Sequence, residues 1–257
     1  MALGGSNIDA ISFSAIRLAS GAITLFIFIT VSRKHALSYK RKNWISATML
    51  FLYVVAFSLA YLSLDAGTGA LILFGAVQMT MVFGAIRSGE TPGGVEWLGI
   101  AIALAGLVYL LLPGLSAPSP AGASLMLASG MAWGIYSLRG RQAEQPLEDT
   151  AANFITTLPM IAVISLVSIP WMHASTEGIV LAVVSGALAS GAGYVIWYMA
   201  LSGLTTTRAA VVQLSVPVLT ALGGVAFLAE IISGRLILSS VMILGGIWLT
   251  IIGHSAE

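Results

Sequence analysis

The chain has 257 residues, of which 58% are hydrophobic and 8% are charged, and its formal net charge is +1. A soluble domain carries about 25% charged residues, so this composition excludes a soluble fold and indicates a protein whose solvent is lipid. The chain contains no cysteine, which excludes a disulfide framework and a thiolate metal site.

Apolar runs of about 20 residues recur along the chain, and each predicts a transmembrane helix. The runs are continuously apolar rather than alternating, which favours helices over a β-barrel. We therefore expect an all-α polytopic membrane protein with nine spans. In chain order the predicted spans are Ile11–Val31, Trp44–Leu64, Gly67–Ile86, Val95–Leu112, Ala121–Leu138, Ala151–Ile169, Gly178–Leu201, Ala209–Ala229 and Leu236–Ile252.

The loops between the spans differ in charge, and Lys and Arg collect on the cytoplasmic side of membrane proteins. If the loop at 32–43 is inside, nine of the eleven basic residues are cytoplasmic, and Arg17 and Arg235 lie toward the outside. The nine are Arg33, Lys34, Lys40, Arg41, Lys42, Arg87, Arg139, Arg141 and Arg208. The sequence thus predicts an outer N-terminus and a cytoplasmic C-terminus.

Two stretches 140 residues apart have the same plan. Residues 70–106 and 210–246 each contain an apolar helix, a Glu, a short glycine-containing turn and a second apolar helix, and Glu90 aligns with Glu230 without a gap. In the predicted orientation these two carboxylates lie at opposite membrane surfaces, so the repeats are inverted. Many secondary transporters have this arrangement, with the substrate site near the membrane midplane.

The repeats predict two domains, an N-terminal one at 1–115 with four spans and a C-terminal one at 116–257 with five. An inverted repeat requires an odd number of spans, so we expect one helix to be missing before Ile11.

Four segments resemble the EamA family of the drug/metabolite transporter superfamily. They are ISFSAIRL (11–18), FGAIRSGETPGGVEWLGIAIALAGL (83–107), PAGASLMLASGMAWGIYSLRGR (120–141) and VVQLSVPVLTALGGVAFLAE (211–230). The resemblance covers about residues 9–252 and implies ten helices in two inverted repeats, with the first helix absent here. It also implies a plasma or inner membrane carrier that exports small metabolites or drugs.

Polar groups within spans are functional hypotheses because they are costly in lipid. The candidates for substrate binding are Arg17, Gln78, Trp133, Tyr136, Tyr194, Gln213 and Pro217. Arg17 is a partner for an anionic substrate group, for Asp65 or for Glu230; alternatively it extends to the lipid headgroups.

The other candidates also have a structural alternative. Gln78 and Gln213 can bind a ligand or bridge helices, and Pro217 frees a backbone carbonyl in a helix that lines a cavity. Trp133 and Tyr194 lie deep enough in their spans to form a pocket wall. We assign the aromatic residues nearer span ends to the interfacial belt; these are Tyr61, Trp197 and Tyr198.

Glu90 and Glu230 end their helices, and both copies keep the Glu, so we favour a capping role over substrate contact. The small-residue run SGALASGAG (185–193) favours close helix packing without chemistry.

The sequence contains no H-E-x-x-H metal motif and no G-x-x-x-x-G-K-[ST] phosphate loop. All three histidines fall outside the predicted spans. We therefore expect no enzyme, no cofactor, no metal and no nucleic-acid partner. The expected function is a secondary transporter that works by alternating access, with a small-molecule substrate, the lipid bilayer as its environment and a homodimer left open. The alternative is a non-transporting membrane protein, a degenerate carrier lacking one helix.

Overall fold

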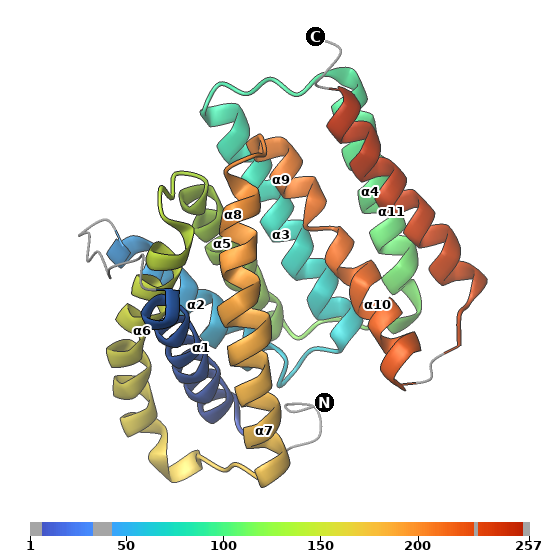
Figure 1. The fold of residues 1–257 in the computed structure, drawn as a ribbon. Coiled ribbons are helices and arrows are strands. Elements are labelled where there is room, and N and C mark those ends of the chain that lie inside the picture. Colours follow the sequence, from blue (N-terminus) through green and yellow to red (C-terminus); the bar gives the residue numbers. More distant parts are fainter. Residues whose placement is uncertain (1–6, 33–42, 229–230, 254–257) are drawn as a thin grey trace. The chain divides into compact units, whose positions relative to one another are not determined.

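The computed structural model describes residues 7–32, 43–228 and 231–253, which are almost entirely helical (Figure 1). The α-helices are α1 (Ala10–Ser32), α2 (Asn43–Ala60), α3 (Ala66–Arg87), α4 (Gly94–Leu111), α5 (Pro120–Gly140), α6 (Pro146–Ser168), α7 (Thr176–Val184), α8 (Gly193–Leu201), α9 (Thr206–Val212), α10 (Ser215–Leu228) and α11 (Gly234–Gly253). Two short 3₁₀ turns, η1 (Leu112–Gly114) and η2 (Ile169–Trp171), follow α4 and α6, and a π-helical segment, η3 (Ser185–Ala192), joins α7 to α8.

Among the described residues, seven helical segments are long and apolar enough to cross a membrane. The apolar helix at 44–60 is shorter, and α5 contains several glycine and serine residues. Every predicted span corresponds to one of these helical segments, so the all-α polytopic membrane fold is confirmed.

The two largest errors in the predicted span ends lie in the sixth and the second span. The sixth span begins at Pro146 rather than Ala151, because Pro146 opens the helix and Glu148 and Asp149 fill its first turn. Proline fits the first helical position, and acidic side chains there complement the helix dipole. The second span ends at Ala60 rather than Leu64, and the chain turns directly after it.

The seventh span is a helix with a π-helical centre. The segment η3 coincides with most of the small-residue run at 185–193 and contacts α1. A side chain added at Gly186 would collide with the Ser20 hydroxyl and the Arg17 carbonyl. The run therefore brings two backbones together as predicted, but it does so through an unusual helical geometry that often marks functional sites.

The eighth span is interrupted just before Pro217. The α9 helix ends at Val212 and α10 begins at Ser215. Pro217 has no N–H to donate to the Gln213 carbonyl, which instead accepts a hydrogen bond of 3.1 Å from the Val216 N–H. The freed carbonyl is thus used by a tighter turn, and the span bends at this point.

The helices form two compact units, each discontinuous in sequence. Unit 1 comprises Met1–Leu64 and Ser119–Gly203, and unit 2 comprises Asp65–Pro118 and Leu204–Glu257. Each unit takes helices from both predicted repeats: unit 1 contains α1, α2 and α5 to α8, and unit 2 contains α3, α4 and α9 to α11. The division at 115 stays a prediction about the repeats, and the compact units cut across it.

Within unit 2, α4 and α11 lie side by side (Figure 1) and run antiparallel. Near one end Gly99 contacts Thr250, and near the other Gly106 contacts Met242. These helices are the second members of the two repeat copies, so their opposite directions agree with the inverted repeat.

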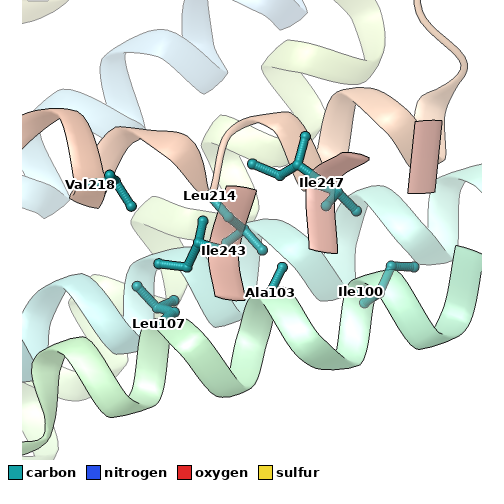
Figure 2. Packing of buried hydrophobic residues seen from close by; sticks show 8 residues of the cluster. Ile100, Ala103, Leu107, Leu214, Val218, Ile243 and Ile247 are labelled. Atoms are coloured by element: carbon teal, nitrogen blue, oxygen red, sulfur yellow. The ribbon is translucent and has the colours of Figure 1, made fainter. Parts of the chain in front are cut away.

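Glycines allow the α4 and α11 backbones to touch. A Cβ at Gly246 would lie 2.5 Å from the Gly99 carbonyl oxygen and 2.7 Å from the Ala103 nitrogen. Beside this seam, α9 and α10 add apolar side chains to a core that Figure 2 shows in close view. The core consists of Ile100, Ala103, Leu107, Val211, Leu214, Val218, Ile243 and Ile247. Small residues of this kind are typical of helix contacts in membranes.

Candidate functional site

Arg17 lies inside unit 1, with 7% of its surface exposed. Its Nε donates a hydrogen bond of 2.7 Å to Ser190 Oγ, and its Nη2 donates one of 3.0 Å to Tyr194 Oη. Its guanidinium carbon lies 5.8 Å from the ring centre of Tyr53 and 5.9 Å from that of Phe57, within cation–π range. The side chain therefore does not extend to the headgroups.

The serine that holds Arg17 belongs to the small-residue run to which we had assigned no chemistry. Ser190 lies in η3 and is fully buried. The sequence marks this run only as small, and that property fits packing as well as binding. Only the folded chain shows that the π-helical turn brings the Ser190 hydroxyl to Arg17.

Aromatic side chains from four helical segments surround this position. The Trp133 ring lies 4.8 Å from both the Tyr53 and the Tyr194 ring, measured between centres. Phe154 lies 5.7 Å from Tyr194, whereas Tyr53 and Trp133 are only half-buried. The two predicted wall residues, Trp133 and Tyr194, thus come together with the predicted Arg17. We call Arg17, Tyr53, Phe57, Trp133, Phe154, Ser190 and Tyr194 the arginine–aromatic cluster.

A second polar group adjoins this cluster through Tyr136. Tyr136 is fully buried, and its ring lies 5.0 Å from that of Tyr198. The Asn153 amide lies 3.5 Å from both hydroxyls, and Gly140 leaves the room that the Tyr198 ring occupies. The interfacial-belt interpretation of Tyr198 is wrong: it is 2% exposed because it packs inward against α5 and α6. Asn153 was not among the predicted site residues.

The two predicted amides lie in unit 2, and their environments differ. Gln78 is 4% exposed, and neither its Nε2 nor its Oε1 has a hydrogen-bond partner among the described residues. Gln213 is also buried, and its Nε2 lies 2.8 Å from Met81 Sδ. Pro217 is half-buried on α10. A buried amide without partners is costly, so Gln78 is the amide whose environment favours a ligand contact.

Glu90 caps a helix, although not the one that it follows. Gly89 has a φ of 88°, which turns the chain directly after α3. The Glu90 carboxylate then accepts hydrogen bonds of 2.6–3.2 Å from the N–H and hydroxyl groups of Thr206 and Thr207, in the first turn of α9. This is the capping geometry expected for a structural role. Glu230 lies outside the described residues.

Two further acidic side chains lie near the ends of spans, and both have hydrogen bonds. Asp65 accepts a hydrogen bond of 2.6 Å from the Ser116 hydroxyl, and Glu96 accepts one from the Gly93 N–H at the start of α4. No group of three or more His, Asp or Glu side chains able to hold a metal ion gathers in the part of the chain that the structure describes.

Asp9 fixes the segment that precedes α1. Its carboxylate accepts hydrogen bonds from the N–H groups of Ile11 and Ser12, and from that of His173 at 2.8 Å. Burial raises the pKa of this carboxyl, but the hydrogen bonds from Ser12, His173 and Ile11 outweigh it, and the net pKa is lowered. Ile8 also forms an antiparallel bridge with Ala174, so the start of α1 is tied to the connection before α7.

Residues 1–112 and 120–252 both match the sequence profile of the EamA-like transporter family. The chain belongs to this family. The resemblance seen in the sequence is thereby confirmed, and the protein is a multi-pass membrane protein of a transporter family whose substrates are small molecules.

The EamA chain is similar to several known proteins. It is 49% identical over 246 residues to the uncharacterised protein PA1977 of Pseudomonas aeruginosa, covering 96% of this chain and 85% of that protein. It is 26% identical over 205 residues to a probable amino-acid metabolite efflux pump of Escherichia coli, covering 74% of this chain and 69% of that protein. A crystal structure with 23% sequence identity superposes with a TM-score of 0.81 over 98% of this chain and 91% of the other, which supports the fold.

Proposed function

We propose that this EamA protein is a secondary exporter of small metabolites that works by alternating access between its two inverted repeats. The observation that carries the proposal is the antiparallel packing of the repeat-related helices α4 and α11. Inverted repeats with interrupted helices are the construction of many secondary transporters, and the break between α9 and α10 supplies such a helix. The similarity to a probable amino-acid metabolite efflux pump supports the direction of transport.

We further propose that the arginine–aromatic cluster, with Tyr136, binds substrate in unit 1. Gln78, Gln213 and Pro217 are separate candidates for substrate contact within unit 2. Buried polar groups in a membrane protein are expensive and mark substrate pathways. Both polar atoms of the Gln78 amide lack a partner among the described residues, and the Arg17 guanidinium contacts no carboxylate there. We assign Glu90 and Glu230 to the framework.

The proposed location is the cell membrane, with the C-terminus in the cytoplasm. The excess of Lys and Arg in alternate loops supports this orientation. A reporter enzyme that is active only outside the cytoplasm, fused after residue 257, is expected to be inactive. An active fusion would reverse the orientation without affecting the transporter proposal.

The direct test is counterflow in proteoliposomes that contain the purified full chain and radiolabelled amino acids. We expect exchange above protein-free liposomes, and slower exchange for Trp133→Ala and Gln213→Ala at equal amounts of folded protein. Trp248→Ala is the matched control for the first variant, because Trp248 is an exposed tryptophan on α11. Unchanged rates in both variants would refute the site assignment. If the wild type exchanges no amino acid and no member of a wider metabolite panel, the non-transporting alternative replaces the proposal.

A further inference from the structure

The charge of Arg17 is buried among neutral groups. Its hydrogen bonds go to the hydroxyls of Ser190, Tyr194 and Tyr53, and the rings of Tyr53 and Phe57 lie within cation–π range. No carboxylate contacts the guanidinium in the part of the chain that the structure describes. A buried charge is costly unless an opposite charge compensates it, so the environment of Arg17 is incomplete without an anion.

The hydrogen bonds also leave donors available. Arginine has five N–H donors in a planar fork that matches a carboxylate, and the bonds to Ser190, Tyr194 and Tyr53 do not use all of them. These bonds fix the orientation of the fork, so a ligand loses less conformational entropy of the Arg17 side chain when it binds. Ser190 reaches Arg17 from the π-helical segment, a geometry that is rare elsewhere and frequent at functional sites.

The aromatic rings define the rest of the ligand. Tyr53, Phe57 and Trp133 are half-buried within unit 1, so part of each ring is left uncovered and can contact the apolar body of a solute. One guanidinium balances one negative charge, whereas a dianionic phosphate would leave an uncompensated buried charge. The arrangement therefore fits a monoanion with an apolar body.

We propose that Arg17 binds the carboxylate of the transported solute and that Tyr53, Phe57 and Trp133 contact its apolar or aromatic body. The substrate class is thus small monocarboxylates, and it does not include amphipathic cations. This inference rests on the proposed transport function for its biological role, but the binding that it predicts is measured separately.

The first test compares two probes that differ only in charge, phenylacetate and its neutral amide phenylacetamide. Their affinities for the full chain in detergent are measured by ligand-induced shifts of the thermal midpoint. Because hydrogen bonds to charged groups are about twice as strong as neutral ones, we expect the carboxylate to bind about tenfold more tightly or better. Equal affinities in the wild type would overturn the proposal without any variant.

The variants then assign the preference to one residue. Arg17→Gln is expected to reduce the affinity ratio to about one. The matched control Arg235→Gln, which removes an exposed arginine at the start of α11, is expected to leave the ratio unchanged. Arg17→Lys keeps the charge but loses the fork, so its ratio is expected to fall to a few-fold and to stay above one. This variant decides the matter if Arg17→Gln does not fold, since an unchanged tenfold ratio in either Arg17 variant would overturn the proposal.

Counterflow of the same probes separates this inference from the transporter proposal. If phenylacetate binds through Arg17 but neither it nor any other solute is exchanged, the carboxylate site stands and the transporter proposal fails. If both probes are exchanged equally by the wild type and by Arg17→Gln, transport stands and the carboxylate site fails.

Discussion

The two units use glycine for different purposes. In unit 2, Gly99 and Gly246 bring the backbones of α4 and α11 into contact. In unit 1, Gly140 makes room for the Tyr198 ring, and Gly21 makes room for Phe154. Unit 2 therefore uses these glycines for backbone packing. Unit 1 has such a backbone contact at Gly186 as well, but it also uses glycines to bury large side chains near a charge.

This difference suggests separate roles: the α4–α11 contact stabilises the fold, and the residues around Arg17 serve a function. Helices in lipid gain little from apolar contact, because lipid tails are as apolar as the side chains. Close backbone approach then becomes the main source of stability, and the α4–α11 seam supplies it. A buried charge without an opposite charge beside it is costly, so the position of Arg17 in unit 1 requires a functional explanation.

The largest effect is expected at the seam of unit 2. Gly246→Val should lower the free energy of unfolding by about 3 kcal/mol, because the atoms in its way belong to the backbones of Gly99 and Ala103 and have little freedom to move. The measurement is the thermal midpoint in detergent together with the yield of monodisperse protein. Gly245→Val is the matched control, since nothing lies within 4 Å of a Cβ at that position. Equal losses of unfolding free energy in both variants would show that the close contact between α4 and α11 does not contribute more to stability than other positions of α11.

The seam and the repeats illustrate how much the sequence could predict. Long apolar runs gave the helices and most of their ends, and the paired Glu and Gly positions gave the inverted repeat, because both signals are local or periodic. Membrane helices are apolar on all sides, so their sequences do not mark which face meets a neighbour. For this reason the interleaved units and the inward position of Tyr198 were not predicted.

The residues of the candidate site could also be predicted only in part from the sequence. Arg17, Trp133 and Tyr194 were selected because charged and aromatic residues deep in a span are unusual, and they do lie together. Ser190 and Asn153 were missed because small polar residues are common in membrane helices. Their positions beside Arg17 and Tyr136 depend on the π-helical turn and on contacts far apart in sequence.

A second test asks whether Glu90 belongs to the framework. Glu90→Ala removes all four hydrogen bonds to the first turn of α9, and we expect a loss of about 2 kcal/mol in unfolding free energy. Glu90→Gln keeps one carbonyl acceptor and should lose less. Counterflow per folded molecule should be unchanged in both variants. A variant that is fully folded but inactive would show that Glu90 takes part in transport and is not only structural.

Gln78 is the residue of unit 2 for which we propose a contact with the solute rather than a structural role, and its replacement tests this assignment. Gln78→Met removes two buried polar atoms that have no partner, so we expect the free energy of unfolding to rise by about 1 kcal/mol. Counterflow should nevertheless fall if the amide contacts the solute. Gln213→Met is the matched control: Gln213 has hydrogen-bond partners, so its replacement should destabilise. Higher stability together with a normal transport rate would show that the Gln78 amide does not contact the solute.

The smallest effect is expected at Asp9, the polar anchor at the edge of unit 1. Because the pKa of Asp9 is lowered in the folded protein, its stabilising contribution is present above the unfolded pKa and disappears as the pH falls through the lower, folded pKa. Asp9→Ala should therefore cost at most about 1 kcal/mol at pH 7, since the group caps α1 but is partly exposed to solvent. The thermal midpoints of wild type and variant, compared from pH 7 downward, should converge below a pH of about 4. A gap that keeps its full size at pH 3 would mean that the carboxylate charge contributes nothing, and that the backbone bridge between Ile8 and Ala174 holds this segment by itself.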